Sequence, residues 1–484
     1  MNATKDKGMD DRLFNDDNER SLLKRIAMPS ILAFLLLLVT PVKNQQEVDT
    51  LIVGGYVFQT ESGKFAPNSG IAIKDGRFAK IGVDPKRFSA KETVRLGDDN
   101  YLLPGLVDCH AHYNVKLIRK RREEFSVMPV IYLANGATVT FSCGEYDPEE
   151  MFKLRKRIES GKQIGPRLLT SGPYFGRARP GWRGKKDPQE IRDEVDFWAS
   201  KGVGGFKAKA IDPDSLKILV EQAHKHGLTV TGHLDSGFRN SVNPRDAISM
   251  GIDRIEHFIG GDAMPDTQSA YTSLQSIKSG TDEWKKIVKH FIDNKTVFDA
   301  TLTAYGYLGI KPGVREEYGY WIDETQFFTP YFKELIKDRK PMIGLELYQR
   351  IYDAKLKTIA DFHKAGGTIS LGTDHVSNGN HLPGFGVHRE LDALVRGGIS
   401  EADALRIGTI NGARALKIDK DHGSIEAGKF ADLVVVTGNP LEKIRNTRNV
   451  KTVFKQGVRH DAKKLLDSVK GKLGPTSKEE ERDW

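Results

Sequence analysis

The chain has 484 residues, of which 38% are hydrophobic and 29% are charged. These proportions exclude an intrinsically disordered protein, and the length allows one barrel-sized domain with a smaller one beside it. The formal net charge of +9 is spread along the sequence without a recognition helix, zinc finger or RNA-binding motif, so it indicates a solvated basic surface and no nucleic-acid partner.

An apolar run from Ile26 to Val39 directly follows Lys24 and Arg25. The run is short for a membrane span and suits the hydrophobic region of a signal peptide. We therefore expect residues 1–46 to be a signal peptide or a membrane anchor, with the protein exported to the periplasm or beyond, or in contact with the membrane through residues 26–39. A peripheral helix or a misassigned start remains the alternative, because the stretch before the run is long and partly acidic.

Short β-type runs separated by glycine turns fill residues 47–100, with Asp75-Gly76 at a hairpin position. A second β-rich stretch occupies residues 416–460. Together they predict one small β-sandwich that is built from both chain ends. Residues 461–484 are charged and predict a loose or helical surface tail.

Residues 101–415 alternate between short β runs and amphipathic stretches such as PDSLKILVEQAHKHG. Strict alternation over eight β runs predicts an α/β fold, a (β/α)8 TIM barrel, in place of an open sheet. The runs are Leu106–Asp108, Ala137–Phe141, Arg167–Ser171, Gly204–Ala208, Thr229–Gly232, Arg254–Glu256, Thr296–Leu302 and Thr368–Gly372. A long aromatic loop, Thr303 to about Leu345, predicts a lid or substrate wall.

Residues that bind metals well fall at the carboxyl ends of these runs, where barrel enzymes build their active sites. His110 and His112 share one face at the end of the first run, because strand side chains alternate with a period of two. The later members of the set are Lys207, His233, His257 and Asp374. Imidazoles with a carboxylate suit zinc or a similar divalent ion, so the pattern predicts a metal site.

The order of these residues, in PGLVDCHAH, GGFKAK, TVTGHL, IEHF and LGTDH, resembles the amidohydrolase superfamily over residues 50–460. GPRLLTSGPYF and HRELDALVRGGIS are most similar to its imidazolonepropionase and prolidase-like branch. Members of that branch hydrolyse dipeptides, N-acyl amino acids or cyclic amides. The resemblance also implies a homo-oligomer.

The same resemblance implies two divalent ions, with zinc expected. The first ion would be held by His110, His112 and Asp374, and the second by His233 and His257. Lys207, carboxylated by carbon dioxide, would bridge them. A metal-activated hydroxide would then attack the carbonyl, with Asp374 as general base and acid.

Each assignment has an alternative. Lys209 faces the same way as Lys207 and could be the bridge instead, and either lysine could simply pair with Asp374. Three nearby histidines are expected to be hydrogen-bonded or solvated and not ligands: His375, His381 and His388. Cys109 and Cys143 fall in predicted strands or strand ends, where core packing is the favoured role.

The third βα loop, GPYFGRARPGWRGKK, places four residues of interest on the catalytic face: Tyr174, Arg177, Arg179 and Arg183. An arginine there could pair with a substrate carboxylate, which would favour dipeptides or N-acyl amino acids over neutral cyclic amides. A solvated basic loop is the alternative. Tyr174 is expected to donate a hydrogen bond to the tetrahedral oxyanion.

The sequence thus predicts a metal-dependent hydrolase of an amide C–N bond in a small or dipeptide-like molecule, similar to an Xaa-Pro dipeptidase, a carboxypeptidase or an N-acyl amino acid hydrolase. The alternative is a cyclic-amide hydrolase or deaminase of the imidazolonepropionase type. A mononuclear enzyme would not need Lys207, which favours the first reading. A catalytically inactive relative is disfavoured because every metal ligand is present. Substrate specificity does not transfer, because Phe141-Ser142 stands where many relatives carry an arginine-aspartate pair.

Overall fold

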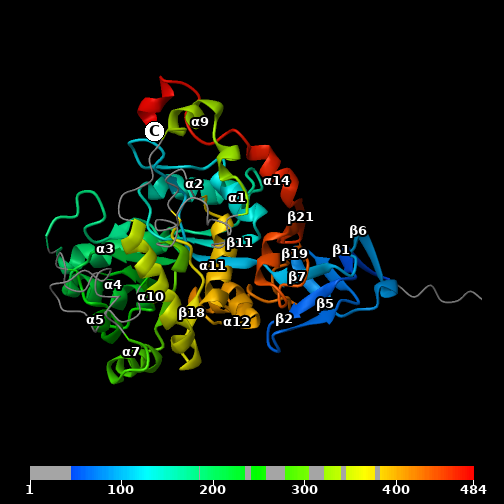
Figure 1. Ribbon diagram of the computed structural model, residues 1–484, viewed down its shortest axis with the longest axis horizontal. Coiled ribbons are helices and arrows are strands. Elements are labelled where there is room, and N and C mark those ends of the chain that lie inside the picture. Colours follow the sequence, from blue (N-terminus) through cyan, green and yellow to red (C-terminus); the bar gives the residue numbers. More distant parts are fainter. Residues whose placement is uncertain are drawn as a thin grey trace, which may run out of the picture. The chain divides into compact units, whose positions relative to one another are not determined.

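The computed structural model describes residues 45–184, 186–234, 241–257, 278–304, 321–338, 345–375 and 382–484. The expected signal or anchor segment up to residue 44 and most of the expected lid lie outside these ranges. Gln45 to Trp484 form one contact unit (Figure 1). None of the helices in the described ranges has the length and apolar character needed to cross a membrane.

Both chain ends contribute to a six-stranded sheet of order β21-β20-β19-β7-β2-β3. Its strands are β2 Tyr56–Gln59, β3 Lys64–Pro67, β7 Asn100–Pro104, β19 Leu433–Thr437, β20 Val450–Lys455 and β21 Val458–Asp461. The central contact is the antiparallel pair β7–β19, in which Leu103 lies opposite Val434. Strands from both ends of the chain therefore share one sheet.

A second sheet, of order β5-β4-β1-β6, comes from the N-terminal stretch alone. It contains β1 Gln46–Val53, β4 Ile71–Lys74, β5 Arg77–Ile81 and β6 Phe88–Arg95. Asp75 (φ 51°) and Gly76 (φ 75°) form the tight turn between β4 and β5, as the Asp-Gly pair predicts. Ile52 and Phe78 of this sheet share a hydrophobic cluster with Leu433 of the other. A sandwich of the two sheets stays a prediction.

All eight predicted barrel strands are present, and each of their ladders is parallel. They are β8 Leu106–Ala111, β11 Ala137–Ser142, β12 Arg167–Leu169, β14 Gly205–Lys209, β15 Thr229–His233, β16 Arg254–Glu256, β17 Val297–Asp299 and β18 Ile369–Ser370. A short extra strand, β13 Tyr174–Phe175, pairs with β14. The core of the chain is therefore a TIM-barrel-like α/β arrangement.

The ladder is not one continuous closed sheet, because the strands divide into β12-β11-β8 and β13-β14-β15-β16-β17-β18. The third strand, predicted over Arg167–Ser171, ends at Leu169. Before β13 begins, Gly172 has φ 68° and Pro173 has no N–H to donate. Backbone hydrogen bonds cross the two seams, including one from Asp374 N to His110 O (2.9 Å). Gly204 N donates to Thr170 O (2.8 Å), and Cys109 N donates to Leu371 O (2.8 Å).

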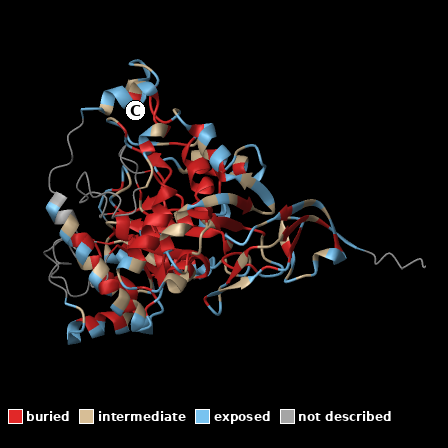
Figure 2. Ribbon diagram, turned by 45° about the vertical axis from the view of Figure 1, so that its right-hand side comes forward, coloured by how far each residue is buried: buried red, intermediate tan, exposed pale blue. Residues whose placement is uncertain are grey.

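The helices alternate with these strands and carry the burial pattern expected of a barrel's outer layer. They are α1 Met128–Ala134, α2 Pro148–Glu159, α3 Pro188–Ser200, α4 Pro213–Lys225, α5 Pro244–Ser249, α7 Asp282–Asp293, α9 Pro330–Ile336, α10 Leu345–Lys364, α11 Phe385–Arg396, α12 Glu401–Arg406 and α13 Gly412–Ala415. Asp147, Asp187 and Asp212 cap α2, α3 and α4, each before a proline at the first helical position. Buried residues gather along the strands, and α2, α3 and α7 expose their outer faces (Figure 2).

Shorter elements complete the description. An antiparallel ladder of two short strands follows the first barrel strand. The two strands are β9 Asn114–Val115 and β10 Arg122–Glu123. The 3₁₀ turns are η1 Pro85–Arg87, η6 Glu324–Phe327, η8 Ile444–Arg448 and η9 Glu480–Asp483, and η7 Ile407–Asn411 is a π-helix.

The charged C-terminal tail is docked, where the sequence predicted a loose or helical segment. Helix α14, Ala462–Val469, buries Leu465 and lies against α1 (Figure 1). The last residue, Trp484, accepts backbone hydrogen bonds from Arg119 N (3.1 Å) and Lys120 N (2.9 Å). The tail therefore covers the segment that follows the first barrel strand.

Candidate metal centre

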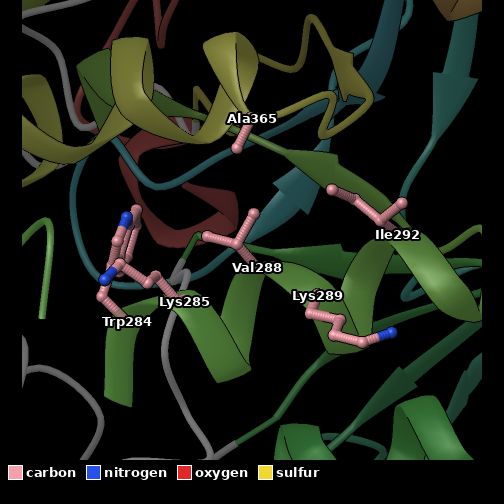
Figure 3. Close-up of a pocket in the computed structure, with 6 residues that line it drawn as sticks. All are labelled: Trp284, Lys285, Val288, Lys289, Ile292 and Ala365. Carbon is pink, nitrogen blue, oxygen red and sulfur yellow. The ribbon is translucent and has the colours of Figure 1, made fainter. Parts of the chain in front are cut away.

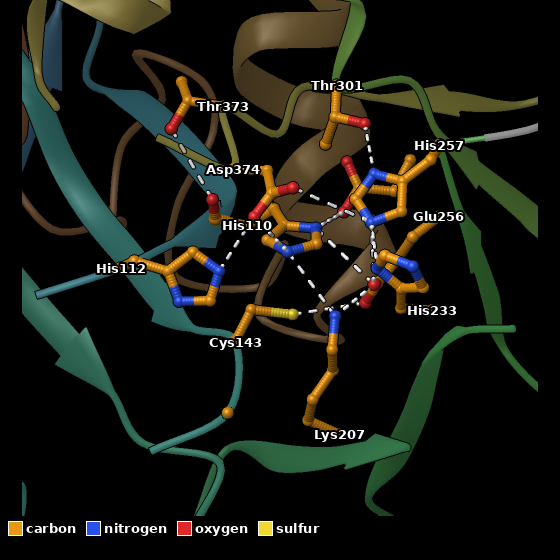
Figure 4. A network of polar contacts seen from close by, with 12 residues as sticks. His110, His112, Cys143, Lys207, His233, Glu256, His257, Thr301, Thr373 and Asp374 are labelled. Carbon is orange, nitrogen blue, oxygen red and sulfur yellow. Dashed lines mark hydrogen bonds and ion pairs between the residues drawn. The ribbon is translucent and has the colours of Figure 1, made fainter. Parts of the chain in front are cut away.

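The first half of the candidate site joins the end of β8 to Asp374, which lies four residues after β18. His112 Nε2 lies 2.9 Å and His110 Nε2 3.4 Å from the same Asp374 oxygen, Oδ1 (Figure 4). Burial opposes ionisation of Asp374, but the adjacent His110 and His112 hold its pKa well below the usual range. Asp374 is therefore an anion in contact with two imidazoles, as the predicted first ligand group requires.

The second half contains His233, at the end of β15, and His257, directly after β16. His257 Nε2 lies 2.9 Å from His233 Nδ1, and the other nitrogen of His257 lies 2.7 Å from Thr301 Oγ1. Burial lowers the pKa of both histidines well below the usual value, and neighbouring cations add to the effect. Both imidazoles are therefore neutral, which is the form that binds metal ions.

Lys207 lies between the two halves, with only 1% of its surface exposed. Its Nζ is 3.4 Å from His110 Nε2 and forms an ion pair with Glu256 Oε2. Burial opposes its charge, but Cys143 and Glu256 raise its pKa. The metal-free alternative considered for this lysine was a pair with Asp374, and the structure pairs it with Glu256 instead.

Lys209 takes a different position from Lys207. Its Nζ lies over the ring of Tyr174, 5.8 Å from the ring centroid, and burial lowers its pKa. No hydrogen bond or ion pair joins Lys209 to Glu256 or to a histidine in the described part of the chain. Of the two lysines, Lys207 therefore has the contacts that a bridging residue needs.

The sequence analysis missed Glu256 and assigned Cys143 to the core. Glu256 is fully buried, and its Oε1 accepts hydrogen bonds from Thr231 Oγ1 (2.7 Å) and Cys143 Sγ (3.2 Å). Strand alternation places Glu256 opposite His257, but His257 has φ 70° and leaves the strand geometry, so both side chains reach the centre. Glu256 could have been noticed as an acidic residue in a predicted barrel strand. For Cys143 the signal was only its place at a strand end.

Groups outside the centre orient the ligands. Asp299 Oδ2 lies 3.3 Å from His110 Nδ1. Asp108 accepts hydrogen bonds from His110 N (3.0 Å) and from Thr373 Oγ1 (2.7 Å), which ties β8 to the segment after β18. Three non-glycine residues beside the centre have positive φ: His257 (70°), Thr301 (40°) and Asp374 (45°). Such backbone strain concentrates at functional sites.

The residues present fit divalent metal ions. Three groups of donor atoms each lie within 4.8 Å of one another: His110, His257 and Asp374; His110, Cys143 and Glu256; and His233, Glu256 and His257. Among the described residues, His112 Nδ1 is a buried nitrogen without a hydrogen-bond partner. Nitrogen, carboxylate and sulfur donors suit zinc and related ions.

The expected oxyanion donor, Tyr174, lies on β13 opposite Lys207 in the ladder and is 2% exposed. Its ring packs against Gly144, where a Cβ would find no room, and lies 5.5 Å from the ring of Tyr146. Burial raises its pKa well above the usual value, so the phenol keeps its proton. Within the described residues its hydroxyl makes no hydrogen bond, and it is available as a donor.

The three arginines of the third βα loop differ in their surroundings. Arg179 forms an ion pair with Glu194 of α3, while Arg177 and Arg183 are exposed. Arg177 also lines a pocket of about 360 Å³, with Trp182, Ala210 and Asp212. No contact joins these arginines to the metal-site residues among the interactions described, and a role in substrate binding stays a prediction.

Two of the other histidines, His375 and His388, make hydrogen bonds to threonines outside the candidate ligand set. His388 Nδ1 lies 3.2 Å from Thr447 Oγ1 and His375 Nε2 3.3 Å from Thr303 Oγ1, as hydrogen-bonded residues should, whereas His381 lies outside the described residues. A separate pocket of about 230 Å³ is lined by Trp284, Lys285, Val288, Lys289, Ile292 and Ala365 (Figure 3). Its lining has neither acid nor histidine.

Comparisons with known proteins give the family of the chain and its fold. Residues 101–459 match the model of the amidohydrolase family. The chain is 21% identical to an ochratoxinase of Aspergillus niger over 467 residues, covering 84% of each protein. It is 25% identical to an adenine deaminase of Moorella thermoacetica over 176 residues, which are 34% of this chain and only 28% of the deaminase. The structure of an Xaa-Pro dipeptidase with bound methionine superposes with a TM-score of 0.62 at 20% identity, over 85% of this chain and 99% of that one, which shows the shared fold.

Proposed function

This chain belongs to the amidohydrolase family, and from that premise we propose that it hydrolyses the amide C–N bond of a dipeptide or an N-acyl amino acid with two divalent metal ions. The observation that carries the proposal is the position of Lys207. Its Nζ lies 3.4 Å from His110 Nε2 of the first group and pairs with Glu256, whose Oε2 lies 3.6 Å from His257 Nε2 of the second. That is the place for a group that connects two ions.

The proposed ligands follow from these contacts. One ion would be held by His110, His112 and Asp374, and the other by His233 and His257. Carboxylation of Lys207 would turn a buried cation into an anionic oxygen donor shared by both. Two divalent ions, with zinc expected, would lower the pKa of a bound water and polarise the scissile carbonyl.

The chain's own residues then move the protons. Asp374 is ionised and held by His112 Nε2 at 2.9 Å, so it can accept a proton from the attacking water. The same carboxyl can pass that proton to the nitrogen of the leaving amine as the C–N bond breaks. Tyr174 keeps its hydroxyl proton and can donate a hydrogen bond to the developing oxyanion.

The test is metal content per chain in protein purified without chelators, with Lys207→Ala and Lys217→Ala prepared in parallel. Lys217 is an exposed lysine of α4 and serves as the matched control. We expect about two ions in the wild type and the control, and a sharp fall in Lys207→Ala. A screen of dipeptides and N-acyl amino acids follows. One ion in all three proteins would contradict the bridged centre.

A second candidate is a cyclic-amide hydrolase or deaminase with one ion. The ion pair between Lys207 and Glu256 favours it, because a lysine that neutralises a buried carboxylate has a role without carboxylation. The partial match to an adenine deaminase is consistent with this candidate. One ion per chain, with activity on ring substrates only, would support it.

A further inference from the structure

Lys209 is the last residue of β14 and lies on the open side of the centre. It follows Lys207 by two positions, so both side chains leave the strand on the same face, with Lys209 nearer the carboxyl end. In the ladders, Lys209 lies opposite His233 of β15, and Tyr174 of β13 lies opposite Lys207. Lys209 is therefore placed between a metal-site histidine and the expected oxyanion donor.

The ammonium group of Lys209 has a contact but no anionic partner. Its Nζ lies over the Tyr174 ring at 5.8 Å, and the residue is half-buried. Within the described residues it makes no hydrogen bond and no ion pair. This contrasts with Lys355, a buried lysine whose Nζ donates to Thr301 O at 2.8 Å.

The nearby acids are already engaged. Asp374 and Glu256 are the acids whose charge reaches Lys209. Asp374 contacts His112 at 2.9 Å, and Glu256 is paired with Lys207. Removing an ammonium from water without an anion costs free energy, and a charged ligand that enters the site offsets that cost.

The next residue, Ala210, lines the pocket of about 360 Å³, whereas Lys209 is not part of its lining. Arg177, Asp212 and Asp214 also line that pocket. Of the arginines that the sequence offered for anion binding, Arg179 is paired with Glu194 and Arg183 is exposed, while Arg177 lines this pocket. Among the described residues, Lys209 is thus a half-buried cation beside the centre that contacts Tyr174 and forms no ion pair.

We infer that Lys209 binds the carboxylate of the substrate, which defines the substrate class as amides whose leaving amine is an amino acid with a free carboxylate. This inference rests on the proposed function and names the group that selects its substrates. The carboxylate pairs with the Lys209 ammonium while the scissile carbonyl lies at the metal site, beside Tyr174 and Asp374. Neutral amides lack that ion pair and bind more weakly.

The test uses substrate pairs with the same scissile bond: N-acetyl amino acids and the corresponding N-acetyl amino acid carboxamides. Lys209→Met keeps the length of the side chain and removes the charge, and Lys217→Met on α4 is the matched control. We expect Lys209→Met to lower kcat/KM for the carboxylates roughly 10- to 100-fold through KM, as for the loss of a charge-assisted hydrogen bond. The preference for carboxylate over carboxamide should disappear, and Lys217→Met should keep it.

Two further measurements separate this inference from the proposed function. Metal content per chain should be the same in Lys209→Met and in the wild type, and a loss of metal would overturn the inference by assigning Lys209 to the centre. Calorimetric binding of free L-amino acids and their carboxamides, as product probes, tests Lys209 without turnover. If the metal-loaded wild type cleaves none of the substrate pairs, that result counts against the proposed function alone. A selective loss of amino acid binding in Lys209→Met would still support the carboxylate site at Lys209.

Three results would overturn the inference. In the first, Lys209→Met affects carboxylates and carboxamides equally or leaves both unchanged. In the second, the wild type does not distinguish the two probes. In the third, the selective loss appears in Arg177→Met instead, which would place the carboxylate at the arginine loop.

Discussion

His257 Nε2 lies 2.9 Å from Nδ1 of His233, so the two imidazoles that would hold the second ion share a hydrogen bond. Both are neutral because burial lowers their pKa values. A neutral imidazole has one donor and one acceptor nitrogen, so the partner of the remaining nitrogen selects its tautomer. For His257 that partner is Thr301, at 2.7 Å from Nδ1.

Replacing Thr301 by valine should weaken metal binding. The hydroxyl fixes the tautomer and the ring orientation of His257, and loss of such a partner costs about 10- to 100-fold in metal affinity. Chelator competition titrations would measure the effect, with Thr452→Val on β20 as the matched control. Equal affinity in Thr301→Val and wild type would exclude this role.

Replacing Tyr174 by phenylalanine should lower kcat about 100-fold with little change in KM, because an oxyanion donor acts mainly in the transition state. Steady-state kinetics on the substrate found by the screen would measure it. Tyr146→Phe is the control, since its ring lies 5.5 Å from that of Tyr174. A parallel loss in Tyr146→Phe would point to packing instead of hydrogen bonding.

The ion pair between Lys207 and Glu256 should be visible in the stability of the metal-free protein. Glu256→Ala leaves the buried Lys207 ammonium without its anion, and removing one partner of a buried pair costs about 3–5 kcal/mol. The double variant Lys207→Met/Glu256→Ala should recover part of that loss. Chemical denaturation of the wild type, both single variants and the double variant would measure the coupling. Additive losses would show that the two residues do not interact.

His388 should make the stability of the protein depend on pH. Burial lowers the pKa of His388 to about 3, from 6.5 in the unfolded chain. The unfolded state therefore binds more protons between these values, so stability is present above pH 6.5 and falls as the pH drops toward 3. The slope of the free energy of unfolding against pH depends on the difference in bound protons between the unfolded and folded states. His388→Gln should lower that difference by up to one proton, which reduces the slope by about 1.4 kcal/mol per pH unit. Denaturation of metal-free protein from pH 4 to pH 8 checks this, and unchanged slopes would refute it.

The candidate site could be predicted from the sequence because barrel enzymes build their active sites at the carboxyl ends of the strands. The predicted ligands lie in, at the end of, or after strands whose existence could be deduced from alternation, and the structure brings His110, His112 and Asp374 into contact. Glu256 was out of reach because the period-two rule fails where His257 adopts φ 70°. The rule describes regular strands, and the site lies where this strand ends.

Other differences have equally local causes. The third strand ends at Leu169, before the turn at Gly172 and before Pro173, which lacks a backbone N–H. A pattern of hydrophobic residues predicts neither of these two effects. The charged tail docks through a few buried side chains such as Leu473 and through its terminal carbonyl at Trp484. Composition alone predicted solvent exposure there, because most of the surrounding residues are charged.

The β7–β19 pair has a consequence for how the protein is made. Leu103 of β7 leaves the ribosome more than 300 residues before Val434, its partner on β19. At ordinary synthesis rates that interval is on the order of tens of seconds. During it the edge of β7 is unpaired, and an unpaired edge invites wrong association. Pairing of β7 is therefore completed only after β19 has been synthesised. A translation product that ends before β19 would keep that edge of β7 exposed.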